Sequence, residues 1–107
     1  MPLLPRVCLA VLILFCASGA NAQSTKQGKL IFTEKADPPC AVCHTLKNAK
    51  AEGEVGPNLD ELRPDQQRVR NAVTNGVGAM PHYGDSLSDA EIAAVARYVA
   101  EAAKAGK

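Results

Sequence analysis

Apolar side chains recur at helical spacing in three stretches of the 107-residue chain after position 22. The last stretch follows the i, i+3, i+4, i+7 order of one helix face, at Ile92, Val95, Ala96 and Val99. Ser88 and Glu91 precede this face at the spacing of a capping box, in which each side chain bonds the other residue's backbone N–H. Gly106 is suited to end the helix. The pattern therefore predicts a long helix from about residue 88 to Gly106.

Two shorter helices are predicted upstream. The first runs through residues 26–32, with Ser24 or Thr25 as its N-cap. It contains Gly28, which is costly inside a helix and therefore suggests that another segment crosses closely there. The second is predicted over Pro64–Asn75, because proline is favoured at the first helical position. Its apolar face consists of Val69, Ala72 and Val73.

The segments between the helices are polar or rich in glycine and proline. Residues 47–54 carry two lysines and predict a solvated loop, residues 55–59 predict a turn, and residues 76–87 predict a glycine-rich loop. No stretch shows the alternation of a strand. We therefore expect an all-α fold, formed by one domain without internal repeats.

The N-terminus has the pattern of a secretion signal. Arg6 precedes a short apolar run, Val7–Ala17, and Ala20-Asn21-Ala22 follows as a small-x-small cleavage site. We expect residues 1–22 to be removed, and residues 23–107 to form the mature domain in the periplasm without a stable membrane span. An uncleaved anchor and lipid attachment at Cys16 are the alternatives, although Phe15 is large for a lipidation site.

Cleavage changes both the charge and the cysteine count. The mature chain keeps 11 basic residues, the chain's 12 less Arg6, against 11 acidic ones, and its formal charge is zero. This balance argues against nucleic acid as a partner, because phosphate binding needs a basic excess. Cys8 and Cys16 leave with the signal, so only Cys40 and Cys43 remain. A chain of this size usually needs a cofactor or staple to complete its core.

The two remaining cysteines lie in Cys40-Ala41-Val42-Cys43-His44, the pattern of a c-type haem attachment site. The two sulfurs must reach two vinyl groups of one porphyrin, and the histidine beside them can offer a ring nitrogen to the iron. A thioredoxin-like dithiol also has this cysteine spacing, but no βαβ pattern accompanies it. A zinc module would have to combine the motif with His82, the other histidine of the chain.

The order of four motifs resembles that of the class I c-type cytochromes over the whole mature region. These motifs are Gly28 with Phe32, the haem motif, Gly56-Pro57-Asn58-Leu59, and Met80-Pro81 before a helix that bears Tyr98. The resemblance implies one covalent haem c, with Cys40 and Cys43 as its thioethers. It also implies that the terminal helices cross near Gly28, with Phe32 and Tyr98 at the contact.

The resemblance also implies the iron ligands. His44 would be the proximal ligand, its Nδ1–H held by the Pro57 carbonyl, and Met80 would be the distal ligand. His82 is the alternative, since it lies two residues away and imidazole binds iron strongly. Met80 is favoured because it is the only methionine of the mature chain, in a glycine-rich loop, and Pro81 stiffens the chain behind it.

These features predict a one-electron carrier, or the electron-accepting subunit of a dehydrogenase, and not an enzyme in its own right. Residues 38–46 are similar to those of small cytochromes associated with periplasmic sulfite dehydrogenases. The expected partners are redox proteins: a periplasmic dehydrogenase as donor, and a terminal oxidase or another cytochrome as acceptor. The chain lacks the dense lysine ring of mitochondrial cytochrome c. A gas-binding or sensory haem protein, with a displaceable distal ligand, is the alternative.

Overall fold

The computed structural model describes residues 19–105, and the fold is helical. Its helices are α1 (Gly19–Leu30), the π-helical turn η1 (Ile31–Lys35), α2 (Cys40–Cys43), the 3-10 turn η2 (Lys47–Ala49), α3 (Leu59–Leu62), α4 (Gln66–Asn75) and α5 (Asp89–Ala105). Two short strands, β1 (Thr45–Leu46) and β2 (Ala51–Glu52), form an antiparallel pair. The predicted all-α class is confirmed, with this hairpin as the one sheet in the described residues.

The first helix begins earlier than the sequence pattern predicted. It starts at Gly19 and runs on through Ser24 and Thr25, so the predicted N-cap at these residues is wrong. No proline interrupts this stretch, and Ala20 and Ala22 are strong helix formers, so the backbone stays helical through the predicted cap. Residues 1–18, which include most of the predicted signal peptide, lie outside the described residues.

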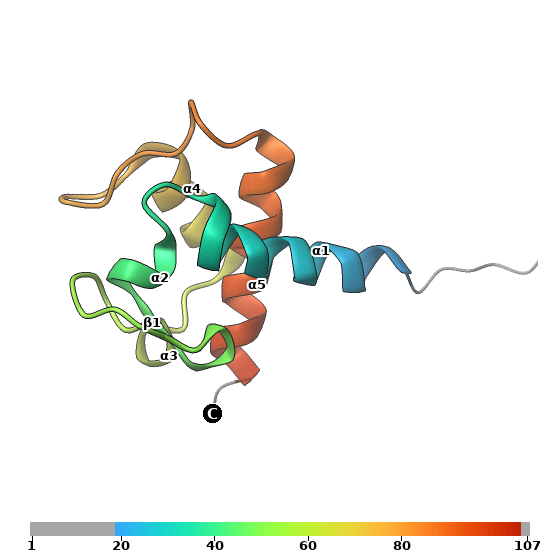
Figure 1. Ribbon diagram of the computed structural model, residues 1–107, viewed down its shortest axis with the longest axis horizontal. Coiled ribbons are helices and arrows are strands. Elements are labelled where there is room, and N and C mark those ends of the chain that lie inside the picture. The colour runs from blue at the N-terminus through green and yellow to red at the C-terminus, as the bar shows by residue number, and fades with distance from the viewer. Residues whose placement is uncertain (1–18, 106–107) are drawn as a thin grey trace, which may run out of the picture.

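The first and last helices cross at a glycine. Figure 1 shows α1 passing over α5, and Gly28 is buried at the contact. A Cβ atom on Gly28 would lie 2.5 Å from the Cβ atom of Tyr98 and would also overlap the Ala94 carbonyl oxygen. Phe32 and Tyr98 meet edge to face there, with their ring centroids 6.1 Å apart. The crossing expected near Gly28 is therefore present. It depends on the close approach of the α1 backbone at Gly28 to the backbone of α5.

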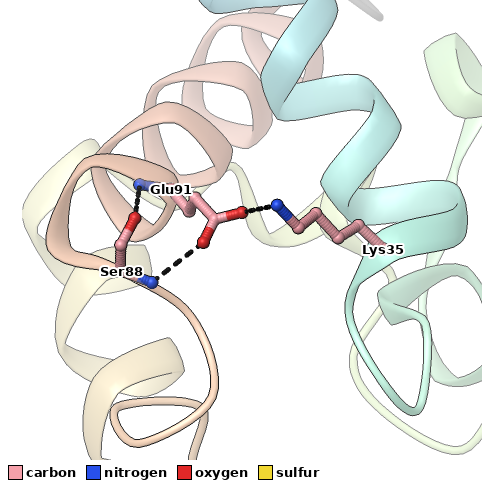
Figure 2. A network of polar contacts seen from close by, with 3 residues as sticks. All are labelled: Lys35, Ser88 and Glu91. Atoms are coloured by element: carbon pink, nitrogen blue, oxygen red, sulfur yellow. Dashed lines mark hydrogen bonds and ion pairs between the residues drawn. The ribbon is translucent and has the colours of Figure 1, made fainter.

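The start of α5 is fixed by the predicted capping box. The Glu91 N–H donates to Ser88 Oγ at 3.1 Å, and the Ser88 N–H donates to Glu91 Oε1 at 3.0 Å. The other carboxylate oxygen of Glu91 forms an ion pair with Lys35 at the end of η1 (Figure 2). Glu91 thus caps its own helix and also joins it to the segment that follows α1.

Two of the predicted connections contain more structure than the pattern indicated. Residues 47–54 are not a fully solvated loop, since they contain η2 and β2, and Ala49 and Ala51 are buried. Residues 55–59 lead directly into α3, because the Asn58 side chain accepts from the N–H groups of Asp60 and Glu61. Small residues inside a polar stretch give no periodic signal, so the sequence pattern missed their burial.

Helix α4 begins two residues after its predicted start. Asp65 is the N-cap, with Oδ1 2.7 Å from the backbone nitrogen of Arg68, and Pro64 is buried just before it. The carboxylate cap competes successfully with the preference of proline for the first helical position. The predicted apolar face is present: Val69 and Val73 are buried and Ala72 is half-buried.

The core lies where α5 packs against α1, α3 and α4. Its largest fully buried side chains are Tyr98, Phe32, Ile31, Leu46 and Val95. Within residues 19–105, no helix is long and apolar enough to cross a membrane.

Candidate functional site

The haem motif consists of the short helix α2, which carries both cysteines, and His44, which directly follows it. Cys40–Cys43 is a single helical turn, closed by a bond from the His44 N–H to the Cys40 carbonyl at 3.0 Å. Residues three apart in a helix lie on the same face, so the two sulfurs face the same side. The cysteines form no disulfide with each other. Burial raises the pKa of the Cys40 thiol to about 11.

The imidazole of His44 is oriented by residues 56 and 57. His44 Nδ1 lies 2.8 Å from the Pro57 carbonyl oxygen. Since a carbonyl can only accept, Nδ1 carries the proton, and Nε2 keeps a lone pair for a metal. Gly56 packs against the ring, because a Cβ atom there would lie 2.6 Å from His44 Cε1. This is the contact that the resemblance implies for Pro57.

The loop between α4 and α5 brings Met80 to the site and leaves His82 outside. Met80 is partly buried against the core and lines the same cavity as Cys40, Cys43 and His44. His82 does not line this cavity. Its side chain is 64% exposed and lies 3.5 Å from the Asp85 carboxylate. The geometry therefore separates the two candidate ligands that the sequence placed side by side.

The cavity has a volume of about 320 Å³. This is within the range of about 300–1,000 Å³ typical of cofactor sites. Its apolar wall includes Phe32, Leu59, Val69, Val73, Val95 and Val99, from η1, α3, α4 and α5. The described residues that line the cavity include no lysine, aspartate or glutamate, and Arg68 is their one arginine. Apolar walls, two thiols on one helix face and an imidazole with a free nitrogen fit a covalent haem.

The residues of the zinc hypothesis are not brought together. Within residues 19–105, no three His, Cys, Asp or Glu side chains are grouped so that they could hold a metal ion. Because His82 points to solvent beside Asp85, it does not complete a tetrad with Cys40, Cys43 and His44. The described residues therefore lack the four-ligand set that a structural zinc ion needs.

Sequence reasoning missed three residues of the site. Tyr83 lines the cavity and is only 4% exposed, although its neighbours in the loop are exposed. An aromatic side chain three residues after Met80 in a polar loop was the available signal. Arg68 could have been predicted to lie near the site, because it directly precedes Val69 of the predicted apolar face. Gly53 packs against the backbone of Val42 and Cys43, and its contacts left no pattern in the sequence.

Comparison with known proteins gives concordant results. The family described as "Cytochrome C oxidase, cbb3-type, subunit III" matches residues 23–99. Cytochrome c6 of Picosynechococcus sp. is 34% identical over 114 residues, which cover 94% of both chains. A cytochrome c6-like protein of Nostoc sp. is 35% identical over 81% of this chain and 78% of its own.

A solved structure is similar in both fold and sequence. It is the c-type cytochrome SorU from Sinorhizobium meliloti, with a TM-score of 0.75 and 55% sequence identity. The match covers 77% of this chain and 93% of that one. The Cys40–His44 motif in the cavity wall is consistent with thioether attachment of the haem that such proteins carry. The chain therefore belongs to the c-type cytochromes, as a small class I member that carries one covalent haem c and transfers electrons to and from redox partners rather than acting as an enzyme.

Proposed function

We propose that this protein is a periplasmic one-electron carrier whose haem iron is held by His44 and Met80. The observation that carries the proposal is that both residues line one apolar cavity, together with Cys40 and Cys43, while His82 lies outside it. If His44 and Met80 both bind the iron, no coordination position would remain for a substrate. The soft thioether of Met80 would favour the ferrous state of the bound haem and so raise its reduction potential.

Each residue of the site has a distinct task in this proposal. Cys40 and Cys43 fix the haem covalently to α2. Pro57 holds the His44 Nδ1–H at 2.8 Å, which fixes the ring orientation and makes Nε2 a stronger donor. The apolar walls would keep most water away from the bound haem, which would limit side reactions.

The ligand assignment is tested by optical spectroscopy of the purified holoprotein. We expect a sulfur–iron charge-transfer band in the deep red of the ferric wild type. The band disappears in Met80→Ala and persists in His82→Ala, which is the matched control two residues away. The reduced wild type does not bind carbon monoxide readily. If the band is absent and carbon monoxide binds at once, the gas-binding alternative is correct instead.

Export is proposed from the N-terminal sequence. The family match begins at residue 23, where the mature chain is expected to start. Mass spectrometry of the periplasmic fraction should give the mass of residues 23–107 plus one haem, which survives acid–acetone extraction. A larger mass that includes residues 1–22, or the mass of a lipid on Cys16, contradicts cleavage after Ala22.

A protein partner would meet the haem at the mouth of the cavity. Val55 and Val77 line the cavity and are 77% and 66% exposed, and Val42, between the two cysteines, is also exposed. Exposed apolar side chains beside a redox centre favour docking of another protein. We propose a periplasmic dehydrogenase as donor and an oxidase or another cytochrome as acceptor. The likeness of residues 38–46 to cytochromes of sulfite dehydrogenases supports this class of donor.

The donor is tested by following haem reduction in periplasmic extract. If a sulfite dehydrogenase is the donor, added sulfite reduces the ferric cytochrome much faster than extract alone does. Val55→Asp and Val77→Asp should slow this reduction without changing the haem spectrum. Reduction that does not depend on sulfite contradicts this donor, and unchanged rates in both variants contradict docking at the mouth.

A further inference from the structure

Tyr83 is a buried residue between exposed neighbours in the loop that joins α4 to α5. It is 4% exposed, whereas Pro81, His82, Gly84 and Asp85 around it are exposed. Its ring lines the cavity only three residues after Met80. The position of Tyr83 therefore determines where the chain that carries Met80 can lie.

The backbone and the side chain of Tyr83 reach two different parts of the fold. Its N–H donates to the Val73 carbonyl of α4 at 2.8 Å. Its hydroxyl donates to the Pro38 carbonyl at 2.7 Å, two residues before Cys40 and 45 positions away in sequence. The loop is thus tied at one residue both to the helix that precedes it and to the segment that leads into the haem motif.

The backbone hydrogen bond of Met80 itself is local by comparison. Its N–H donates to the Val77 carbonyl at 2.9 Å, within the tip of the same loop. Such a bond keeps the shape of the loop but does not hold the loop against the rest of the molecule. The Tyr83 hydroxyl, in contrast, ties the loop to a residue 45 positions away.

We propose that Tyr83 is a positioning residue, whose hydroxyl bond to Pro38 latches the Met80 loop across the cavity and limits how often the distal position opens. The inference rests on the proposed ligation by Met80 for its effect at the iron, but the position of the loop does not depend on it. Burial raises the pKa of Tyr83 to about 12, so its hydroxyl remains a donor throughout the neutral range.

Tyr98 provides a matched control in the same chain. Its hydroxyl donates to Asn48 Oδ1 at 2.6 Å, and its ring is 1% exposed. Burial raises the pKa of Tyr98 to about 12 as well. This bond joins α5 to η2 and does not touch the Met80 loop. Tyr83→Phe and Tyr98→Phe therefore each remove one buried phenol bond and keep the ring, and only the first releases the loop.

The first test is binding of imidazole to the ferric holoprotein, because imidazole must displace the distal ligand. One intramolecular hydrogen bond changes an equilibrium by roughly two- to tenfold. We expect Tyr83→Phe to strengthen imidazole binding by about that factor, while Tyr98→Phe leaves it unchanged despite a similar loss of thermal stability. Equal effects in the two variants, or no effect of Tyr83→Phe, would overturn the latch.

The second test separates the latch from the identity of the ligand. Amide hydrogen exchange over residues 76–87 reports opening of the loop whichever residue binds the iron. Exchange in this segment should rise by roughly two- to tenfold in Tyr83→Phe and stay at the wild-type rate in Tyr98→Phe. If the wild type lacks the sulfur–iron band, ligation by Met80 fails, yet faster exchange in Tyr83→Phe still supports the latch. Unchanged exchange refutes it.

Discussion

Gly28 lies so close to Tyr98 that one added methyl group would approach the Tyr98 Cβ atom to 2.5 Å. The same group would overlap the Ala94 carbonyl oxygen, which belongs to the backbone of α5 and cannot rotate away. The contact between the first and last helices therefore depends on the absence of a side chain at this position.

Gly28→Ala is expected to destabilise the protein, although alanine is the better helix former. Forcing the helices apart costs about 1–3 kcal/mol in well-packed sites, which exceeds the helical gain of about 1 kcal/mol. Urea unfolding followed by circular dichroism measures the change. Gln27→Ala, at the exposed neighbouring position, is the control and should be neutral or slightly stabilising. A stabilised Gly28→Ala would show that the helices have room to separate freely.

Gly56→Ala is expected to disturb the proximal ligand while the haem stays attached. The added Cβ would press on the His44 ring and weaken its bond to the Pro57 carbonyl. A poorer donor stabilises ferric iron less, so the reduction potential should rise. Pro57→Ala keeps the carbonyl but loosens the turn that aims it, so its potential should move the same way by a smaller amount. Potentiometric titration measures both shifts. If neither potential changes, residues 56–57 form an ordinary turn that does not tune the proximal ligand.

Glu91→Gln is expected to change the pH dependence of stability. Lys35 and Ser88 hold the pKa of Glu91 below its ordinary value of 4.5 in the folded protein. The folded state therefore binds this proton less readily than the unfolded chain, so the stabilisation is present at neutral pH and is lost as pH falls through the folded pKa.

Urea unfolding at about pH 7 and about pH 3 separates these states. The advantage of the wild type over Glu91→Gln should be largest at the neutral pH and should shrink in acid. Glu101→Gln, an exposed position on the same helix, is the matched control and should show a much smaller pH-dependent difference. A constant gap between wild type and Glu91→Gln would mean that Glu91 acts only as a neutral cap.

The sequence predicted those parts of the fold in which side chains carry the local signal. The capping box of Ser88 and Glu91 is present as predicted, because the two residues satisfy each other and need no distant partner. The family resemblance implied the approach of α5 to Gly28 and the His44–Pro57 contact, and both are present. Separation of Met80 from His82 depends on how the loop folds, which spacing alone does not determine.

Features that depend on small residues or distant backbone were missed. Ala49 and Ala51 are buried by the hairpin, yet alanine is common on helices, strands and surfaces alike. The first turn of α4 is set by the Asp65 side chain and not by Pro64, and both are reasonable starts by local preference. The bond from Tyr83 to Pro38 spans 45 positions, so no local pattern could indicate it.

The cavity for the haem is complete only when the last helix, α5, has packed. Val95 and Val99 of α5 complete the cavity wall, and α5 packs on a helix that lies some 70 positions earlier. Contacts between such distant segments form late, because the intervening chain must first be brought together. Until α5 has packed against the first helix, Cys40 and Cys43 therefore lie on an incomplete cavity wall, where an incoming haem can reach both thiols.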